Sequence, residues 1–130
     1  MSTELTLLGW TLVLALAQIL LPGFLRTGET GIAYNAGPRD GEGPPVGVVT
    51  GRLRRAQSNL FETLPLFAAA ILIATLAGRT GPLTWWGATL YFWGRVVYVP
   101  LYTFGVPYLR SAAWAVSTLG LVLILVRLLG

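Results

Sequence analysis

The sequence predicts an all-α integral membrane protein, a four-helix bundle in a single domain over residues 1–130. Hydrophobic residues make up 55% of the chain and charged residues only 11%, whereas soluble domains carry about a quarter charged residues. Four apolar runs of roughly 20 residues follow one another, which is the length that a helix needs to cross a bilayer. Segments rich in Gly and Pro separate these runs, as is typical of connections between helices.

The four spans are expected at about residues 5–25, 52–77, 83–104 and 109–129. The first run has Gln18 as its one strongly polar side chain, and we attribute to Gln18 a role in helix–helix contact. It lacks the basic start of a cleavable signal peptide, so we keep it as a helix of the mature protein. The third run carries Arg95 near its middle. The fourth ends at Arg127, which is placed to reach the membrane surface.

Three connections join these spans. Residues 26–51 contain seven Gly and three Pro, so we predict a long loop, and long ordered loops are often functional. Residues 78–82 (Gly-Arg-Thr-Gly-Pro) predict a tight turn, and Gly105-Val106-Pro107 predicts a break between the last two helices.

The charges predict an orientation in the membrane. All nine basic residues are Arg, and most lie at the ends of apolar runs, which favours membrane topology over nucleic-acid binding. Two, Arg79 and Arg127, lie on the side of the termini. Six flank the first and third loops: Arg26, Arg39, Arg52, Arg54, Arg55 and Arg110. The positive-inside rule then places both loops in the cytoplasm and both termini outside it.

The absence of Cys and His excludes several kinds of chemistry. Disulfides, cysteine nucleophiles and histidine acid–base catalysis are impossible, and no His/Cys metal site can form. We therefore predict no metal site.

Ionisable residues inside the apolar runs mark the candidate site, because they are costly in lipid. The second run carries Arg55, Asn59 and Glu62 at i, i+4 and i+7, a spacing that places them on one helical face. The third run carries a similar set at i, i+3 and i+7: Arg95, Tyr98 and Tyr102.

The depths of Glu62 and Arg95 predict an ion pair. At about 1.5 Å per residue, each lies roughly 15 Å from the loop end of its helix. Such a pair could equally lock two helices together without a ligand. Arg110 enters the same region from the start of the fourth run. Trp10 and Trp114 carry no functional signal. Several guanidinium groups with one carboxylate suit a small zwitterionic ligand that has more than one carboxylate, beside an apolar second ligand from the lipid.

Residues 55–67 (RAQSNLFETLPLF) resemble the signature R-A-x-x-N-x-x-E-x-x-P-x-F of the MAPEG family, the membrane-associated proteins of eicosanoid and glutathione metabolism. The string Tyr34–Asp40 (YNAGPRD) is similar to the bacterial branch of this family. Gly94-Arg95-Val96 and the pair Tyr98-x-x-x-Tyr102 resemble the third helix of its eicosanoid synthases.

The resemblance implies a homotrimer that binds glutathione between neighbouring subunits. It assigns catalysis to Arg110, which would stabilise the glutathione thiolate, and to Ser111 beside it. The Arg110 match requires a one-residue shift. The implied glutathione contacts are Arg26, Arg55, Asn59, Glu62, Arg95, Tyr98 and Tyr102.

Three functions are compatible with these features to different degrees. The first is a glutathione transferase or peroxidase of the bacterial inner membrane, in which a thiolate attacks hydrophobic electrophiles or lipid peroxides. The second is a trimeric family member without glutathione activity, with a structural or lipid-binding role. The third is a small four-span multidrug transporter. That class carries a Glu in the middle of its first helix, whereas here no acid lies between Glu4 and Glu29.

Overall fold

The computed structural model describes residues 1–39, 41 and 43–130. Asp40, which ends the predicted 34–40 string, and Glu42 lie outside the described residues. The described residues contain no strand, and the all-α prediction is confirmed. They form four long helices and one short one: α1 (Thr3–Thr30), α2 (Ile32–Ala36), α3 (Val48–Leu76), α4 (Pro82–Thr103) and α5 (Pro107–Leu129).

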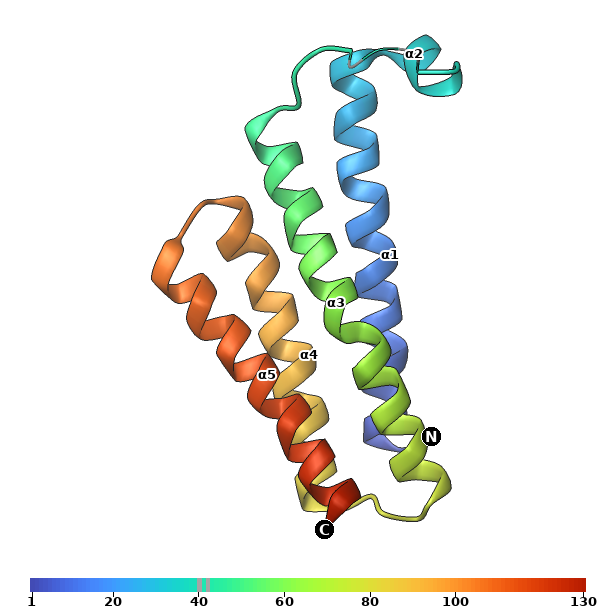
Figure 1. Cartoon of the computed structure of the whole chain (residues 1–130), viewed down its shortest axis with the longest axis vertical. Coiled ribbons are helices and arrows are strands. Elements are labelled where there is room, and N and C mark those ends of the chain that lie inside the picture. The colour runs from blue at the N-terminus through green and yellow to red at the C-terminus, as the bar shows by residue number, and fades with distance from the viewer. Residues whose placement is uncertain (40, 42) are drawn as a thin grey trace.

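The long helices form two antiparallel hairpins that lie side by side, α1 with α3 and α4 with α5 (Figure 1). Both chain ends and the turn between α3 and α4 lie at one end of the molecule. The short helix α2 lies at the other end, which we call the loop end (Figure 1). There α1 and α3 extend beyond α4 and α5, so the start of α3 is left uncovered by the second hairpin.

Three helices are long and apolar enough to cross a membrane: α1, α3 and α5. Large apolar side chains on their outer faces are exposed, among them Leu16, Leu72 and Val122. Such faces are stable in lipid, and a helix satisfies its own backbone hydrogen bonds there. The chain is therefore an integral membrane protein. Helix α4 has 22 residues but carries Arg95 and several Trp and Tyr, so the fourth span stays a prediction.

The predicted turns lie where the glycines and prolines indicated. Gly78 (φ 68°) follows α3, and Gly105 (φ 72°) follows α4; both adopt a left-handed conformation that glycine accepts without strain. Pro82 and Pro107 begin α4 and α5, the position in a helix where a missing N–H costs nothing.

Small residues bring α4 and α5 into close contact. A methyl group added to Gly94 would lie 2.9 Å from Ser117 Cβ. One added to Gly87 would lie 2.6 Å from the Gly120 carbonyl oxygen. Membrane helices gain much of their packing energy from such close approach, because lipid supplies no hydrophobic drive between them. These contacts fix the relative position of the two helices that carry most of the candidate site.

An aromatic stack joins the two hairpins. The rings of Phe67 on α3 and Tyr91 on α4 are 4.0 Å apart at their centroids and nearly parallel. The Tyr91 hydroxyl also shares a hydrogen bond of 2.9 Å with Thr63. A buried Tyr hydroxyl requires such a partner, so this contact fixes both the height and the rotation of α4 against α3.

The loop predicted over residues 26–51 is shorter than expected. Helix α1 continues to Thr30, α2 occupies part of the segment, and α3 begins at Val48. Apolarity ends at Leu25, but helical hydrogen bonding does not require apolar side chains, so the helix passes through Gly28. The prediction was wrong at both ends because it equated the limits of the apolar run with the limits of the helix.

The ends of this connection are held by Glu29. Its carboxylate accepts hydrogen bonds from Arg26 (3.0 Å), from the Gly47 amide (3.1 Å) and from the Thr50 hydroxyl (2.6 Å). A side chain at position 47 would meet the carboxylate, since a methyl group there would lie 2.6 Å from Glu29 Oε2. We call this set of contacts the Glu29 bracket.

Candidate functional site

An open cavity of about 320 Å³ lies among α3, α4 and α5. It falls within the size range of small-molecule sites. Its walls come from the three helices on which the sequence placed the site. The lining residues are Asn59, Tyr98, Tyr102, Arg110, Ser111 and Trp114, so the structure brings together five of the nine predicted site residues.

Tyr102 is the centre of a cationic cluster. Arg55 on α3 donates from Nε to the Tyr102 hydroxyl at 3.1 Å. From α5, the Arg110 guanidinium carbon lies 4.7 Å from the centroid of the Tyr102 ring. The ring face attracts a cation, so Tyr102 holds two guanidinium groups that would otherwise repel each other.

A second cation lies behind the aromatic wall. Arg95 is 2% exposed, and its guanidinium carbon lies 4.8 Å from the Tyr98 ring centroid. The rings of Tyr98 and Tyr102 are 5.5 Å apart. Among the described residues, the buried atoms Arg95 Nη2 and Asn59 Oδ1 have no hydrogen-bond partner. Buried polar groups are rarely left so, which makes this region chemically unlike a packed core.

The predicted ion pair between Glu62 and Arg95 is wrong. The ion pair found among the described residues is Arg26–Glu29. Glu62 is exposed, whereas Arg95 is buried. The depth argument fixed how far along the helix each residue lies but not its rotation. The buried face of α3 carries Ala56, Leu60 and Phe67; Glu62, two residues after Leu60, lies off this face and stays exposed, so its carboxylate does not pair with the buried guanidinium.

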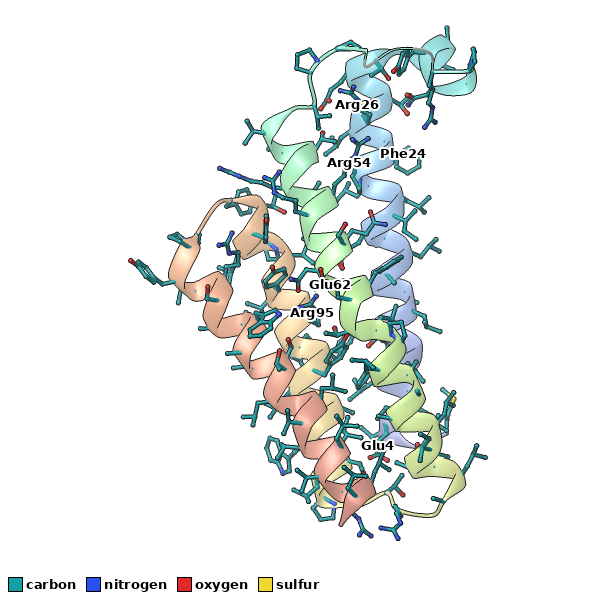
Figure 2. The ribbon with its side chains drawn as sticks, in the orientation of Figure 1. Glu4, Phe24, Arg26, Arg54, Glu62 and Arg95 are labelled. Atoms are coloured by element: carbon teal, nitrogen blue, oxygen red, sulfur yellow. The ribbon has the colours of Figure 1, made fainter. Side chains whose placement is uncertain are left out.

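Two other predicted residues take different positions. Arg26 is 8% exposed and donates to the carbonyl oxygens of Pro44 (2.6 Å) and Pro45 (3.1 Å). It lies at the loop end, away from the cavity between α4 and α5 (Figure 2). Ser111 does line the cavity, and its hydroxyl donates to the Pro107 carbonyl oxygen at 3.3 Å. The glutathione contacts assigned to Arg26 and Glu62 stay predictions.

Trp114 forms part of the cavity wall, although the sequence analysis gave it no functional signal. The structure gives Trp114 a position in this wall but assigns it no function. The spacing of Arg110 and Trp114 is i, i+4, which places both on one face of α5. Trp114 therefore lies on the same face of α5 as Arg110, and the sequence spacing alone indicated this.

The chemistry of the cavity wall suits an anion. The described lining residues contribute one guanidinium, two phenols, one amide, one hydroxyl and one indole, with no acidic side chain among them. Arg55 reaches it through Tyr102, and Arg95 lies behind Tyr98. The described residues contain no group of three metal-ligating side chains. Charge-assisted hydrogen bonds from guanidinium groups are the strong contacts that carboxylates and similar anions form.

Comparison with known proteins identifies the family. The sequence model of the MAPEG family matches residues 6–130, which covers the long helices except the first three residues of α1 and includes all the residues of the cavity. The search of curated proteins found no match. The chain therefore belongs to the MAPEG family.

Proposed function

We propose that the protein is a membrane-bound, glutathione-dependent transferase or peroxidase that acts on hydrophobic electrophiles or lipid peroxides. The observation that carries this proposal is the convergence of Arg55 from α3 and Arg110 from α5 on Tyr102, at the edge of a cavity with no acidic side chain among its described lining residues. Membership of a family that includes glutathione transferases and peroxidases supports it.

The residues divide into two roles. Arg55, Asn59 and the two tyrosines offer donors for the carboxylates of glutathione. Arg110 is the group we assign to the sulfur. A free thiol has a pKa of about 8.5 and is mostly protonated at neutral pH, and a nearby guanidinium favours the thiolate. Ser111 follows Arg110 on the same cavity wall and can donate a second hydrogen bond when it leaves the Pro107 carbonyl.

When bound, glutathione supplies the nucleophilic sulfur. In a transfer, the carbon–sulfur bond forms as the leaving group departs with its electron pair, and the thiol proton passes to solvent. With a lipid hydroperoxide, the O–O bond breaks, and the net reaction oxidises two glutathione thiols to their disulfide while the peroxide is reduced to an alcohol and water. Arg110 stabilises the sulfur anion before attack. Trp114 is 42% exposed and offers an apolar surface for a second substrate that arrives from the lipid.

The test uses the purified protein in detergent. Titration calorimetry should detect glutathione binding, and a coupled assay should detect thiol-dependent turnover of an aromatic halide or a lipid hydroperoxide. Ophthalmic acid, which has the carboxylates of glutathione but no thiol, is the matched control and should bind without turnover. If neither compound binds, the family member has a structural or lipid-binding role instead.

The exposure of Glu62 is an argument that the chain assembles into a homotrimer. It is exposed on α3, roughly 21 Å along the helix from its start at Val48. A charged side chain facing lipid near the bilayer centre costs about 2.5–3.5 kcal/mol on insertion scales. A second copy of the chain that covers this face would remove the cost.

We expect native mass measurement in several mild detergents to give three times the 14.0 kDa of the chain. Substitution Glu62→Leu, which suits lipid, should shift the population toward monomer. The exposed Leu66→Ala on the same helix serves as the control. A monomer for the unmodified protein in every detergent would contradict the trimer.

The arginine distribution supports a bacterial inner-membrane protein with the loop end in the cytoplasm and both termini outside it. A reporter that is active only in the cytoplasm, fused after Gly130, should stay silent. Activity of that reporter would reverse the topology.

A further inference from the structure

A second cavity, of about 370 Å³, lies at the loop end between the last turns of α1, the segment that contains α2, and the start of α3. It shares no lining residue with the cavity between α4 and α5. We call it the loop-end cavity. The proposed glutathione chemistry does not use it.

Its polar part consists of arginines. Three of them line it, Arg26, Arg39 and Arg54, and the lining contributed by residues 1–39, 41 and 43–130 includes no acidic side chain. The charge of Arg26 is balanced by Glu29, and its guanidinium donates to two loop carbonyls. Arg39 is oriented by a 3.0 Å hydrogen bond from its Nε to the Asn35 carbonyl oxygen. The cavity therefore has one fixed, compensated cation and two others beside it.

Arg54 differs from its neighbours on α3. Arg52 donates to the Thr103 carbonyl oxygen, and Arg55 donates to Tyr102, so both are directed toward α4. The Arg54 side chain is exposed, and it has no hydrogen bond or ion pair with any residue that the structure describes. Figure 2 shows Arg54 near Arg26 and Phe24, well separated from Glu62 and Arg95. Its charge is thus available to a ligand.

The other part of the loop-end cavity is apolar and faces the lipid. Ile19, Leu20 and Phe24 line it and are 44%, 46% and 70% exposed. Ile19 lies about 10 Å deeper along α1 than Arg26. Apolarity of α1 ends at Leu25, so the arginines lie where the hydrocarbon meets the headgroups. Cationic groups at the surface, with an apolar wall directly below, match the outline of a phospholipid.

We propose that the loop-end cavity binds one anionic membrane phospholipid, with its phosphate at Arg54 and Arg39 and an acyl chain along Ile19, Leu20 and Phe24. A soluble phosphate would leave the apolar wall unused. A zwitterionic lipid would bring its own cation to a cavity whose lining already carries three. Surface arginines attract anionic lipids in general. Here the arginine side and the apolar side of the loop-end cavity together define where the headgroup and the acyl chain of one lipid lie.

The experiment is native mass spectrometry of the detergent-purified protein titrated with phosphatidylglycerol or phosphatidylcholine of identical acyl chains. We expect a bound phosphatidylglycerol and little phosphatidylcholine. Arg54→Gln should weaken phosphatidylglycerol binding roughly fivefold, because one surface arginine contributes about a factor of that size. Arg79→Gln removes an exposed arginine at the opposite end of the molecule and is the matched control.

Several outcomes would overturn the proposal. Equal binding of the two lipids would remove the requirement for an anion. An equal loss in Arg54→Gln and Arg79→Gln would show a general charge effect. Competition by soluble glycerol phosphate at the concentration of the lipid would assign the cavity to free phosphate. Phe24→Ala should weaken lipid binding without lowering the melting temperature, since Phe24 is 70% exposed; unchanged binding in this variant would also count against the proposal.

Discussion

Replacing Arg110 with alanine should lower the turnover of thiol conjugation about 10²–10³-fold, while the protein stays folded and assembled. The removal of one preorganised donor to a reacting anion typically costs about 2.7–4 kcal/mol in the transition state. Arg110 makes no ion pair with a described residue and rests on the Tyr102 ring, so its loss strands no buried partner. Turnover at saturating glutathione is the measurement, and the ultraviolet absorbance of bound thiolate should disappear with it.

Arg79→Ala is the matched control for Arg110→Ala, because it removes the same charge at the opposite end of the molecule, away from the cavity. It should leave turnover unchanged. Arg110→Lys keeps the charge without the planar guanidinium and should recover part of the rate. Full activity in Arg110→Ala would place the thiolate elsewhere. Loss of the folded protein would make Arg110 a structural residue.

The substitution Gly120→Ala should lower the melting temperature, although alanine is the better helix former. A methyl group at position 120 would overlap the Gly87 carbonyl oxygen and lie 2.7 Å from the Tyr91 nitrogen. Both atoms belong to the backbone of α4, so neither can move without moving the helix. Overpacking of this kind costs about 1–3 kcal/mol, more than the gain of up to about 1 kcal/mol from helix propensity.

Gly9→Ala provides the comparison for Gly120→Ala. Gly9 lies inside α1, and an added methyl group meets no atom within 4 Å. The same change should therefore raise the melting temperature slightly. Differential scanning calorimetry or a thermal shift in one detergent measures both variants. Opposite signs are expected; a rise in both would mean that α4 and α5 are less closely packed than the structure indicates.

Local chemistry made the elements predictable from the sequence. Gly78 and Gly105 adopt positive φ at the predicted turns, and Pro82 and Pro107 begin helices there. The periodicity also predicted that Arg55, Asn59 and Glu62 share one side of α3; Arg55 contacts Tyr102 and Asn59 lines the cavity, whereas Glu62 does not line it. Periodicity does not determine how the helix is rotated, and therefore which neighbouring helix that side faces. Rotation depends on contacts such as the Phe67–Tyr91 stack, whose partners lie 24 residues apart in the chain.

The candidate site was also predictable only where its contacts are close in the sequence. The convergence of α4 and α5 was predictable because a short break joins them, and Tyr98, Tyr102 and Arg110 do line one cavity. The position of Arg26 was not predictable, because the loop carbonyls that it binds belong to Pro44 and Pro45, 18 and 19 residues away. No pattern in the sequence indicates which carbonyl a long flexible side chain will reach.

The Glu29 bracket also bears on how freely the first connection can change length. Because Glu29 holds Gly47 and Thr50 directly, the helices on either side are positioned by the bracket and not by the chain between them. Doubling such a segment costs only about 0.6 kcal/mol in closure entropy. Insertions and deletions between Gly37 and Pro44 should therefore be nearly neutral for folding, and this stretch is where related sequences can differ in length while their helices keep the same register.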